Sequence, residues 1–242
     1  MALIKTKGII LSENKMGDYD KMVTMLTPGY GKIGCVAKGA RKPKSLLMAS
    51  TQFLCFGEYL LYKGAETYHI NSAETIEIFY PIRTDLDKLK YASHITKIIL
   101  EVTTENENSY KVLQLFLNTL YMIAETNQDL DFLISVFKLR LICLLGFTPT
   151  IHECTQCHKK ENISYFSLKQ NGVLCNSCGK LDTSCIQISA TTVDAIRYIV
   201  MAPPKKIFSF EVPEEAQREL SLVTKLYLNA KLEKEYLLEE LF

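Results

Sequence analysis

Residues Met22 to Ala37 read MVTMLTPGYGKIGCVA, two apolar runs on either side of Pro28-Gly29-Tyr30-Gly31. Valine, isoleucine and threonine in these runs favour β-strands. Glycine tolerates the positive φ that a tight connection needs. This stretch therefore predicts two strands joined by a tight turn.

The same strand chemistry extends over the first 80 residues. Turn signals, among them Lys63-Gly64-Ala65-Glu66, separate five segments rich in β-branched and aromatic residues: Lys7 to Leu11, Met22 to Thr27, Lys32 to Ala37, Gln52 to Tyr62 and Thr67 to Ile78. Five short strands in this length predict a small closed or nearly closed β-barrel, which removes the edges of an open sheet. An SH3-like barrel would have the same number of strands.

After Pro81 the apolar residues recur at three- and four-residue intervals, which is typical of helices. The first such helix follows the possible cap Asp85, and the others are predicted over Ser109 to Glu125, Leu130 to Leu145, Thr192 to Met201 and Pro213 to about Ala230. The segment from Leu130 is apolar on nearly every side and stops at Gly146, with Pro149 just beyond. We expect it to be the central helix of a bundle.

Four cysteines lie in a segment that interrupts the helical region. They form two CxxC pairs, Cys154 with Cys157 and Cys175 with Cys178, separated by seventeen residues. This spacing predicts a closed tetrahedral Cys₄ site for one structural Zn²⁺ ion, with short strands of a zinc ribbon between the pairs. His152 or His158 could replace one cysteine as a ligand.

The other cysteines, Cys35, Cys55, Cys143 and Cys185, have no comparable spacing. The first three lie in apolar runs and are interpreted as small buried hydrophobic residues. A thioredoxin-like role is disfavoured for either CxxC pair, because the pairs occur together and neither is expected to open a helix after a buried strand.

Composition excludes several classes of protein. An apolar fraction of 48% with 23% charged residues excludes a disordered chain. No apolar run approaches the roughly 18 residues of a membrane span, and the N-terminal segment lacks the apolar core of a signal peptide. A cytoplasmic protein is therefore expected, in a compartment where cysteines bind metals more often than they form disulfides.

Charge is distributed unevenly although the formal net charge is only +1. Residues 1–82, 83–153, 154–210 and 211–242 carry nets of +3, −2, +4 and −4. No acidic residue occurs from Lys21 to Gly57, where six basic residues lie near Tyr30, Phe53 and Phe56. Lysine and arginine bind phosphates and aromatic rings stack on bases, so this segment is a candidate nucleic-acid site. Alternatively, it is a solvated basic loop, with Phe53 and Phe56 in the core.

Several motifs then occur in a distinctive order: Gly8-Ile-Ile-Leu11, Gly17-Asp-Tyr-Asp-Lys21, Thr27-Pro-Gly-Tyr-Gly-Lys-Ile33, Ala37-Lys-Gly-Ala-Arg-Lys-Pro-Lys-Ser45, and Leu144-Leu-Gly-Phe147 before the cysteines. In this order they resemble the RecO family of bacterial recombinational-repair proteins. The resemblance covers about residues 1 to 180 well, and the remainder only in layout.

The resemblance implies an α+β multidomain chain. An oligonucleotide/oligosaccharide-binding (OB) barrel would occupy residues 1–80, and a helical domain residues 81–150 and 183–242, with a zinc-ribbon-like insertion at 151–182. It also implies a mediator, associated with the nucleoid in the cytoplasm, that binds single- and double-stranded DNA and anneals complementary strands. With RecR, and RecF, such a mediator loads RecA onto DNA coated by single-stranded DNA-binding protein. No enzymatic activity is expected, and the chain has no GxxxxGK[ST] phosphate-binding loop.

The family's basic AKGARxPxS stretch corresponds to Lys38, Arg41, Lys42 and Lys44, which we expect to contact phosphates together with Lys32. Gly39 would let the backbone approach DNA, or simply turn. The C-terminus departs from the basic ends of many family members, since Glu233, Glu235, Glu239 and Glu240 dominate it. We therefore expect a solvated helix face or a protein contact there.

Two other classes of function stay open. A protein-interaction adaptor would use the barrel and helices to hold partners and would bind little DNA. A zinc-dependent enzyme would need a three-ligand site with an open position, and the sequence contains neither HExxH nor an HxE motif with PCxxC.

Overall fold

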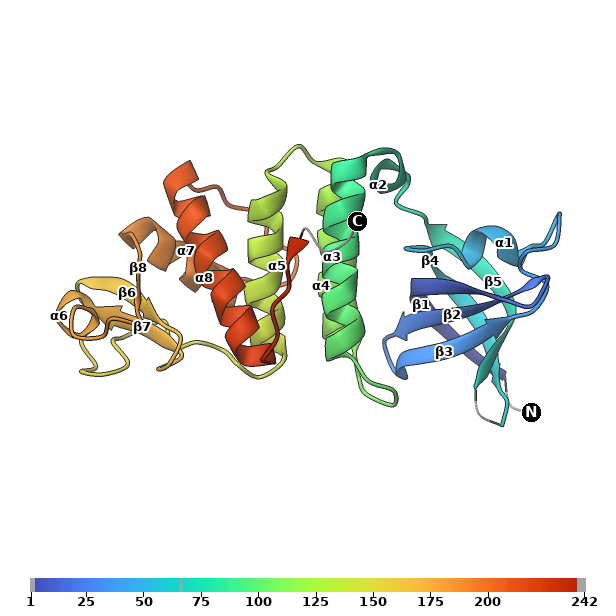
Figure 1. Ribbon diagram of the computed structural model, residues 1–242, viewed down its shortest axis with the longest axis horizontal. Helices are drawn as coiled ribbons and strands as arrows, with labels where there is room; N and C mark the ends of the chain where they lie inside the picture. Colours follow the sequence, from blue (N-terminus) through green and yellow to red (C-terminus); the bar gives the residue numbers. More distant parts are fainter. Residues whose placement is uncertain (1–2, 66, 239–242) are drawn as a thin grey trace. The chain divides into compact units, whose positions relative to one another are not determined.

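The structure is a computed structural model in which residues 3–65 and 67–238 are described (Figure 1). The chain divides into two compact units, Met1–Gln114 and Leu115–Phe242. The first unit contains the predicted β-region. The second contains most of the helices and the two CxxC pairs.

Five strands form a closed barrel in the first unit: β1 (Leu3–Met16), β2 (Asp20–Thr27), β3 (Gly31–Ala37), β4 (Phe56–Lys63) and β5 (Tyr68–Glu77). Their order is β1-β2-β3-β5-β4, and only the pairing of β3 with β5 is parallel. The predicted turn at residues 28–31 is confirmed, because Thr27 pairs with Gly31 across the β2–β3 connection. Side chains that alternate inward, such as Val23, Met25 and Ile33, fill the barrel.

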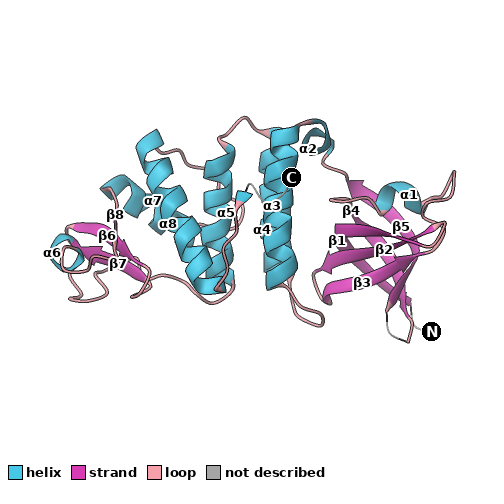
Figure 2. Cartoon of the chain, in the orientation of Figure 1, coloured by secondary structure: helices cyan, strands magenta, loops and turns pink. Residues whose placement is uncertain are grey.

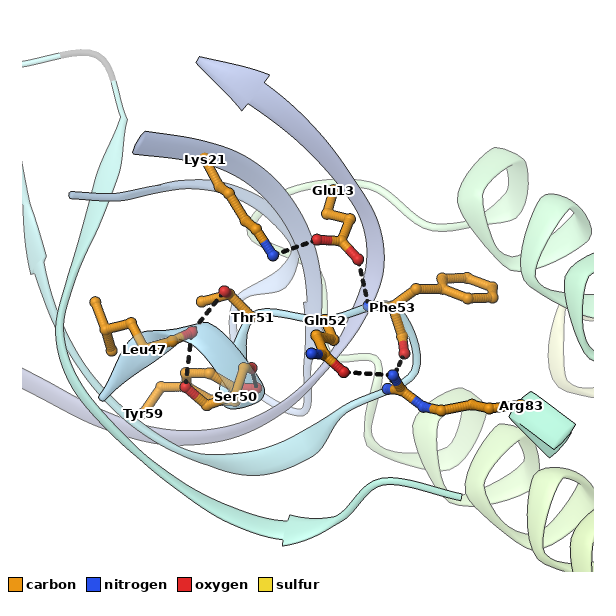
Figure 3. Close-up of polar contacts among 9 residues, drawn as sticks. All are labelled: Glu13, Lys21, Leu47, Ser50, Thr51, Gln52, Phe53, Tyr59 and Arg83. Carbon is orange, nitrogen blue, oxygen red and sulfur yellow. Dashed lines mark hydrogen bonds and ion pairs between the residues drawn. The ribbon is translucent and has the colours of Figure 1, made fainter. Parts of the chain in front are cut away.

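The predicted strand over Gln52 to Tyr62 is wrong in its first residues, because β4 begins only at Phe56. Leu54 has a φ of 61°, which an extended strand does not allow. Phe53 donates its N–H to Glu13 Oε1 and accepts a hydrogen bond from Arg83 Nη2 (Figure 3). These side chains hold residues 52–55 in a turn, which apolar composition alone does not reveal.

Three helices accompany the barrel: α1 (Leu47–Ser50), α2 (Tyr80–Thr84) and α3 (Leu86–Val102). The predicted cap of α3 is confirmed, since Asp85 accepts hydrogen bonds from Asp87 N and Lys88 N. The loop after α3 attaches to the β2–β3 turn through hydrogen bonds from Ser109 N to Pro28 O and from Asn106 N to Tyr30 O. Helices α1 and α2 were not predicted, because four or five residues are too few to show a helical period.

Helix α4 (Tyr110–Glu125) crosses the boundary between the units. In the second unit α5 (Leu130–Leu144) packs against α7 (Ala190–Met201) and α8 (Glu214–Leu232), which confirms α5 as a central helix. Its one buried lysine is Lys138, whose pKa is lowered to about 8 by burial and by the Lys225 ammonium. Gly146, with a φ of 94°, follows the end of α5 as predicted.

Among the described helices, none combines the length and apolar character needed to cross a membrane.

The cysteine segment contains β6 (Ile163–Ser167), β7 (Gly172–Cys175), α6 (Asn176–Gly179) and β8 (Ile186–Gln187) (Figure 2). The strands form a small sheet in the order β7-β6-β8. The short strands predicted between the cysteine pairs are confirmed as β6 and β7. The two-residue β8 and the single turn of α6 were missed, because neither is long enough to show a periodicity.

Candidate metal centre and nucleic-acid interface

The four paired cysteines meet at one point. The Sγ atoms of Cys154, Cys157, Cys175 and Cys178 all lie within 4.8 Å of one another, and those of Cys157 and Cys175 are 3.6 Å apart. A tetrahedron with Zn–S bonds of about 2.3 Å has S–S edges of about 3.8 Å. The cluster therefore fits a tetrahedral metal ion that is held by four sulfurs.

Tight backbone turns bring the two CxxC pairs together. Cys154 N donates to Lys159 O at 2.8 Å, and His158 N donates to Cys154 O at 2.9 Å. His158 has a φ of 61°, which closes this first turn. Cys175 ends β7, and Cys178 lies in the single turn of α6 that follows.

The local electrostatics favour thiolates at two of the four positions. Burial alone would raise the pKa of Cys154, but backbone N–H groups, those of Cys175 and Cys157 first, lower it to about 6. The backbone N–H of Cys178 lowers the pKa of Cys175. Burial and the neighbouring thiols raise the pKa of Cys178 to about 12. A divalent cation would remove that penalty, because coordinated thiols lose their protons.

The histidine alternative finds no support in the described geometry. The cluster contains neither His152 nor His158, and His158 Nδ1 lies 2.8 Å from Glu153 Oε1 instead. One argument against a redox role was wrong, because Cys175 does precede a helix after a buried strand. That helix has only four residues, however, and both pairs share one cluster.

Apolar packing braces the cysteine cluster. Leu174 is fully buried beside it, and Ile163, Tyr165 and Cys185 pack against it. Gly179 lies directly under Tyr165, and a Cβ atom placed on Gly179 would be 2.3 Å from the Tyr165 ring. The turn that carries the second CxxC pair therefore requires glycine at residue 179.

The second candidate site is the basic loop, residues 38–44, which leaves β3. Ala37 and Ala40 are fully buried and anchor its start in the barrel core. Gly39, with a φ of 66°, donates its N–H to Asp20 Oδ1 at 2.7 Å. Arg41 N donates to Tyr19 O at 2.8 Å.

These bonds attach the basic loop to the β1–β2 turn. The motif Gly17-Asp-Tyr-Asp-Lys21 therefore supports the motif that begins at Ala37, and Arg41 Nη1 adds a bond to Gly17 O at 3.1 Å. Of the four predicted phosphate contacts in the loop, Lys38, Lys42 and Lys44 are exposed and Arg41 is half-buried. The loop is thus held mainly by its backbone, while its three lysine side chains face solvent.

Two basic residues of the predicted segment lie outside this loop. Lys21 forms an ion pair with Glu13. Lys32 donates its ammonium to Leu100 O, and it lies near the opposite end of β3 from Lys38, roughly 20 Å along the strand. The structure does not bring Lys32 together with the other four predicted residues.

The aromatic residue beside the basic loop is Tyr19, which the sequence reasoning missed. Its side chain is 53% exposed, and Lys42 Nζ lies 5.5 Å from its ring centroid. Tyr30 instead packs against the barrel core, and Phe53 and Phe56 are half-buried. Tyr19 precedes the acid-free segment and stands between two aspartates, so a search for basic runs passes over it.

Comparison with known proteins gives consistent matches along the chain. The family model "Recombination protein O N terminal" matches residues 1–79, and "Recombination protein O C terminal" matches residues 83–238. The chain belongs to the RecO family.

Relatives in this family match over nearly the whole chain. A protein of Acetivibrio thermocellus named DNA repair protein RecO is 40% identical over 237 residues, which cover 98% of this chain and 94% of the relative. Proteins of the same name from Alkaliphilus metalliredigens and Caldicellulosiruptor bescii are 31% and 30% identical, and cover 96% and 100% of this chain. Each match covers at least 94% of the relative's own length.

The RecO resemblance inferred from the motifs is therefore confirmed. Of the three cysteines predicted to be buried, Cys35 and Cys55 are buried, and burial raises the pKa of Cys35 to about 12. The prediction is wrong for Cys143, which is half-buried near the end of α5. Cys185, for which no burial was predicted, is also half-buried. At the C-terminus Glu233 and Glu235 are exposed, in agreement with a solvated surface, and Glu239 and Glu240 lie outside the described residues.

Proposed function

We propose that this RecO-family chain is a DNA-binding mediator of recombinational repair. It would bind single- and double-stranded DNA and anneal complementary strands. With RecR, and RecF, it would load RecA onto DNA coated by single-stranded DNA-binding protein. Membership of the RecO family supports the general role in DNA repair, and the basic loop supports direct contact with DNA.

We further propose that the barrel, residues 1–80, is an OB-fold. Its closed five-stranded order, with the long β1 paired to both β2 and β4 and a helix between β3 and β4, supports this assignment. Small barrels of this kind are frequent platforms for single-stranded nucleic acid. The helical domain at 81–150 and 183–242 and the insertion at 151–182 complete the proposed arrangement.

The observation that carries the DNA proposal is the construction of the basic loop. Lys38, Lys42 and Lys44 extend from a backbone that Asp20 and Tyr19 hold in place. A held loop loses little conformational entropy when its cations bind phosphates. Lys32 is left out of the proposed contact set because its ammonium already binds Leu100 O.

Backbone contact suits strand annealing, because bases must stay available for pairing. Contacts to phosphate position a protein on a strand without reading its sequence. Four neutralised phosphates on a single strand give a slope of about −3 in log K against log salt. We expect weak dependence on base sequence.

The metal that fits the cysteine cluster best is Zn²⁺. Four thiolate ligands favour Zn²⁺ over the harder Mg²⁺ and Ca²⁺ ions. A site closed by four protein ligands has no open position for a substrate or a reactive water. We therefore assign one Zn²⁺ ion a structural role in holding residues 151–182 together.

The decisive experiment compares two variants that each remove four positive charges. One replaces Lys38, Arg41, Lys42 and Lys44 with alanine, and the other replaces the four exposed lysines of the insertion, Lys159, Lys160, Lys169 and Lys180. In fluorescence anisotropy over a salt series, the first variant should lose most of the DNA affinity and of the salt slope. Equal losses in both variants would show a general charge effect and contradict the assignment to the basic loop.

The mediator role is tested separately by annealing of complementary oligonucleotides coated with single-stranded DNA-binding protein. We expect the chain to accelerate annealing, and the basic-loop variant to accelerate it much less. No acceleration, with or without RecR, would contradict the mediator role. Failure to retard DNA at low salt would instead favour the adaptor alternative, in which the barrel binds proteins.

A further inference from the structure

Tyr19 has the properties of a base-stacking residue rather than those of a packed tyrosine. It lies in the β1–β2 turn with 53% of its surface exposed. No hydrogen bond of its hydroxyl is found within the described residues. The packing of the barrel therefore does not account for a large aromatic side chain at this exposed position.

The backbone around Tyr19 is nevertheless fixed. Its carbonyl accepts the N–H of Arg41, and the carboxylate of Asp20, the next residue, accepts the N–H of Gly39. Both partners belong to the basic loop, so the ring and the four cations project from one connected piece of backbone. A backbone that is already ordered loses little conformational entropy when a ligand binds to its side chains.

The ring also has a cation at close range. Lys42 Nζ lies 5.5 Å from its centroid, within the range of a cation–π contact, and the side chain of Lys42 is itself exposed. An ammonium in this position can contact the phosphate next to a base that stacks on Tyr19.

We propose that Tyr19 stacks on an unpaired base of single-stranded DNA while Lys42 and its neighbours bind the adjacent phosphates. This inference rests on the proposed DNA binding and adds the ligand class that the site prefers. Asp18, which precedes Tyr19 in the sequence, is exposed, and its carboxylate would repel a phosphate but not the neutral face of a base. In a duplex the base faces are covered by their neighbours, so the ring favours unpaired strands.

The test uses the full chain and a deoxythymidine oligonucleotide with one central 2-aminopurine, whose fluorescence is quenched by stacking. Tyr19→Ala should weaken single-strand binding by roughly 10-fold, since one base–aromatic stack generally contributes about 5- to 150-fold in affinity. It should also abolish the quenching and leave duplex binding nearly unchanged. Tyr19→Phe should behave like the wild type, because it keeps the ring.

Tyr121→Ala serves as the matched control, because Tyr121 is 59% exposed on α4 and lies in the second unit. It should leave binding and quenching unchanged. An oligonucleotide with abasic sites in place of the central bases gives a second readout. The wild type should bind it less tightly than the intact strand, and Tyr19→Ala should bind both equally.

The outcomes separate this inference from the proposed function. If the wild type binds no DNA, the proposed function fails and the inference fails with it. If the wild type binds and Tyr19→Ala keeps full affinity and quenching, only the stacking inference is overturned. Equal losses of single-strand and duplex binding in Tyr19→Ala, or loss in Tyr19→Phe, would also overturn it, since either result would assign the ring a different role.

Discussion

The cysteine cluster and the basic loop each present four functional side chains, but they present them in opposite ways. The four sulfurs converge within 4.8 Å of one another. The four cations of the basic loop extend from a loop whose backbone, not its side chains, makes most of the stabilising bonds. The sulfurs are closed on themselves, whereas the three lysines of the basic loop are open to solvent.

This difference predicts the kind of ligand for each region. Converging thiolates surround a single small ion and leave no space for a second ligand. Such a site therefore stabilises the local fold. Separated cations match a polyanion whose charges are spaced along a chain. Such a set therefore binds an external partner. Substitutions in the first region should therefore change folding, whereas those in the second should change binding.

The largest effect is expected from Cys175→Ser. A structural zinc site contributes on the order of 10 kcal/mol to its folded state at neutral pH, and loss of one thiolate forfeits much of that. The variant should bind less than one zinc ion per chain, and residues 151–182 should exchange their amide hydrogens rapidly. Elemental analysis and hydrogen-exchange mass spectrometry measure both quantities.

Cys185→Ser is the matched control for this prediction. Cys185 packs against the cluster without belonging to the four converging thiols. The Cys185→Ser variant should retain one zinc ion per chain and slow amide exchange in residues 151–182. Loss of zinc in this control, or full zinc content in Cys175→Ser, would contradict the assignment of ligands.

A smaller effect is expected from Gly179→Ala, which keeps all four ligands. The added Cβ atom would lie 2.3 Å from the Tyr165 ring. Crowding of this kind lowers the free energy of unfolding by about 1–3 kcal/mol. Zinc affinity, measured by competition with a chromophoric chelator, should fall by roughly 10-fold or more. Gly29→Ala is the control, because a Cβ atom there meets nothing within 4 Å, and an equal loss in that variant would contradict this explanation.

The two regions also differ in how far the sequence predicts them. The cysteine ligands follow from spacing alone, because two CxxC pairs at this separation leave few other arrangements. The strands around them follow from composition, although β8 and α6 are too short to leave a signal. Long elements such as α5 are predicted almost to the residue, since burial on nearly every side leaves a mostly apolar segment of helical length.

The basic loop is predicted less completely, because its support comes from residues distant in sequence. Charge counting finds Lys32 and Lys38 alike, yet one binds Leu100 O and the other faces solvent. Tyr19 was missed for the same reason. Its position beside the loop depends on the antiparallel pairing of β2 with β3, which places the end of β3 next to the start of β2.

The smallest effect is expected from two substitutions of Asp20, which separate the charge of the β1–β2 turn from its support of the basic loop. Asp20→Asn removes a negative charge near the cations and keeps an acceptor for Gly39 N, so it should bind DNA slightly more tightly than the wild type. Asp20→Ala removes the charge and also the acceptor. The lost hydrogen bond would reduce the stability of the DNA-binding loop conformation by about 1 kcal/mol. We therefore expect Asp20→Ala to bind DNA about 5-fold more weakly than Asp20→Asn, with faster amide exchange at Gly39.

The same pair of substitutions at Asp18 provides the control, because Asp18 is exposed and its carboxylate does not hold the loop. Alanine and asparagine should be equivalent there in anisotropy measurements at two salt concentrations. All four variants remove one negative charge. A difference in DNA affinity between alanine and asparagine that occurs only at Asp20 therefore reports the loss of the hydrogen bond to Gly39 N. If Asp20→Ala and Asp20→Asn bind equally, the loop does not need its hydrogen bond to the β1–β2 turn, and affinity depends on charge alone.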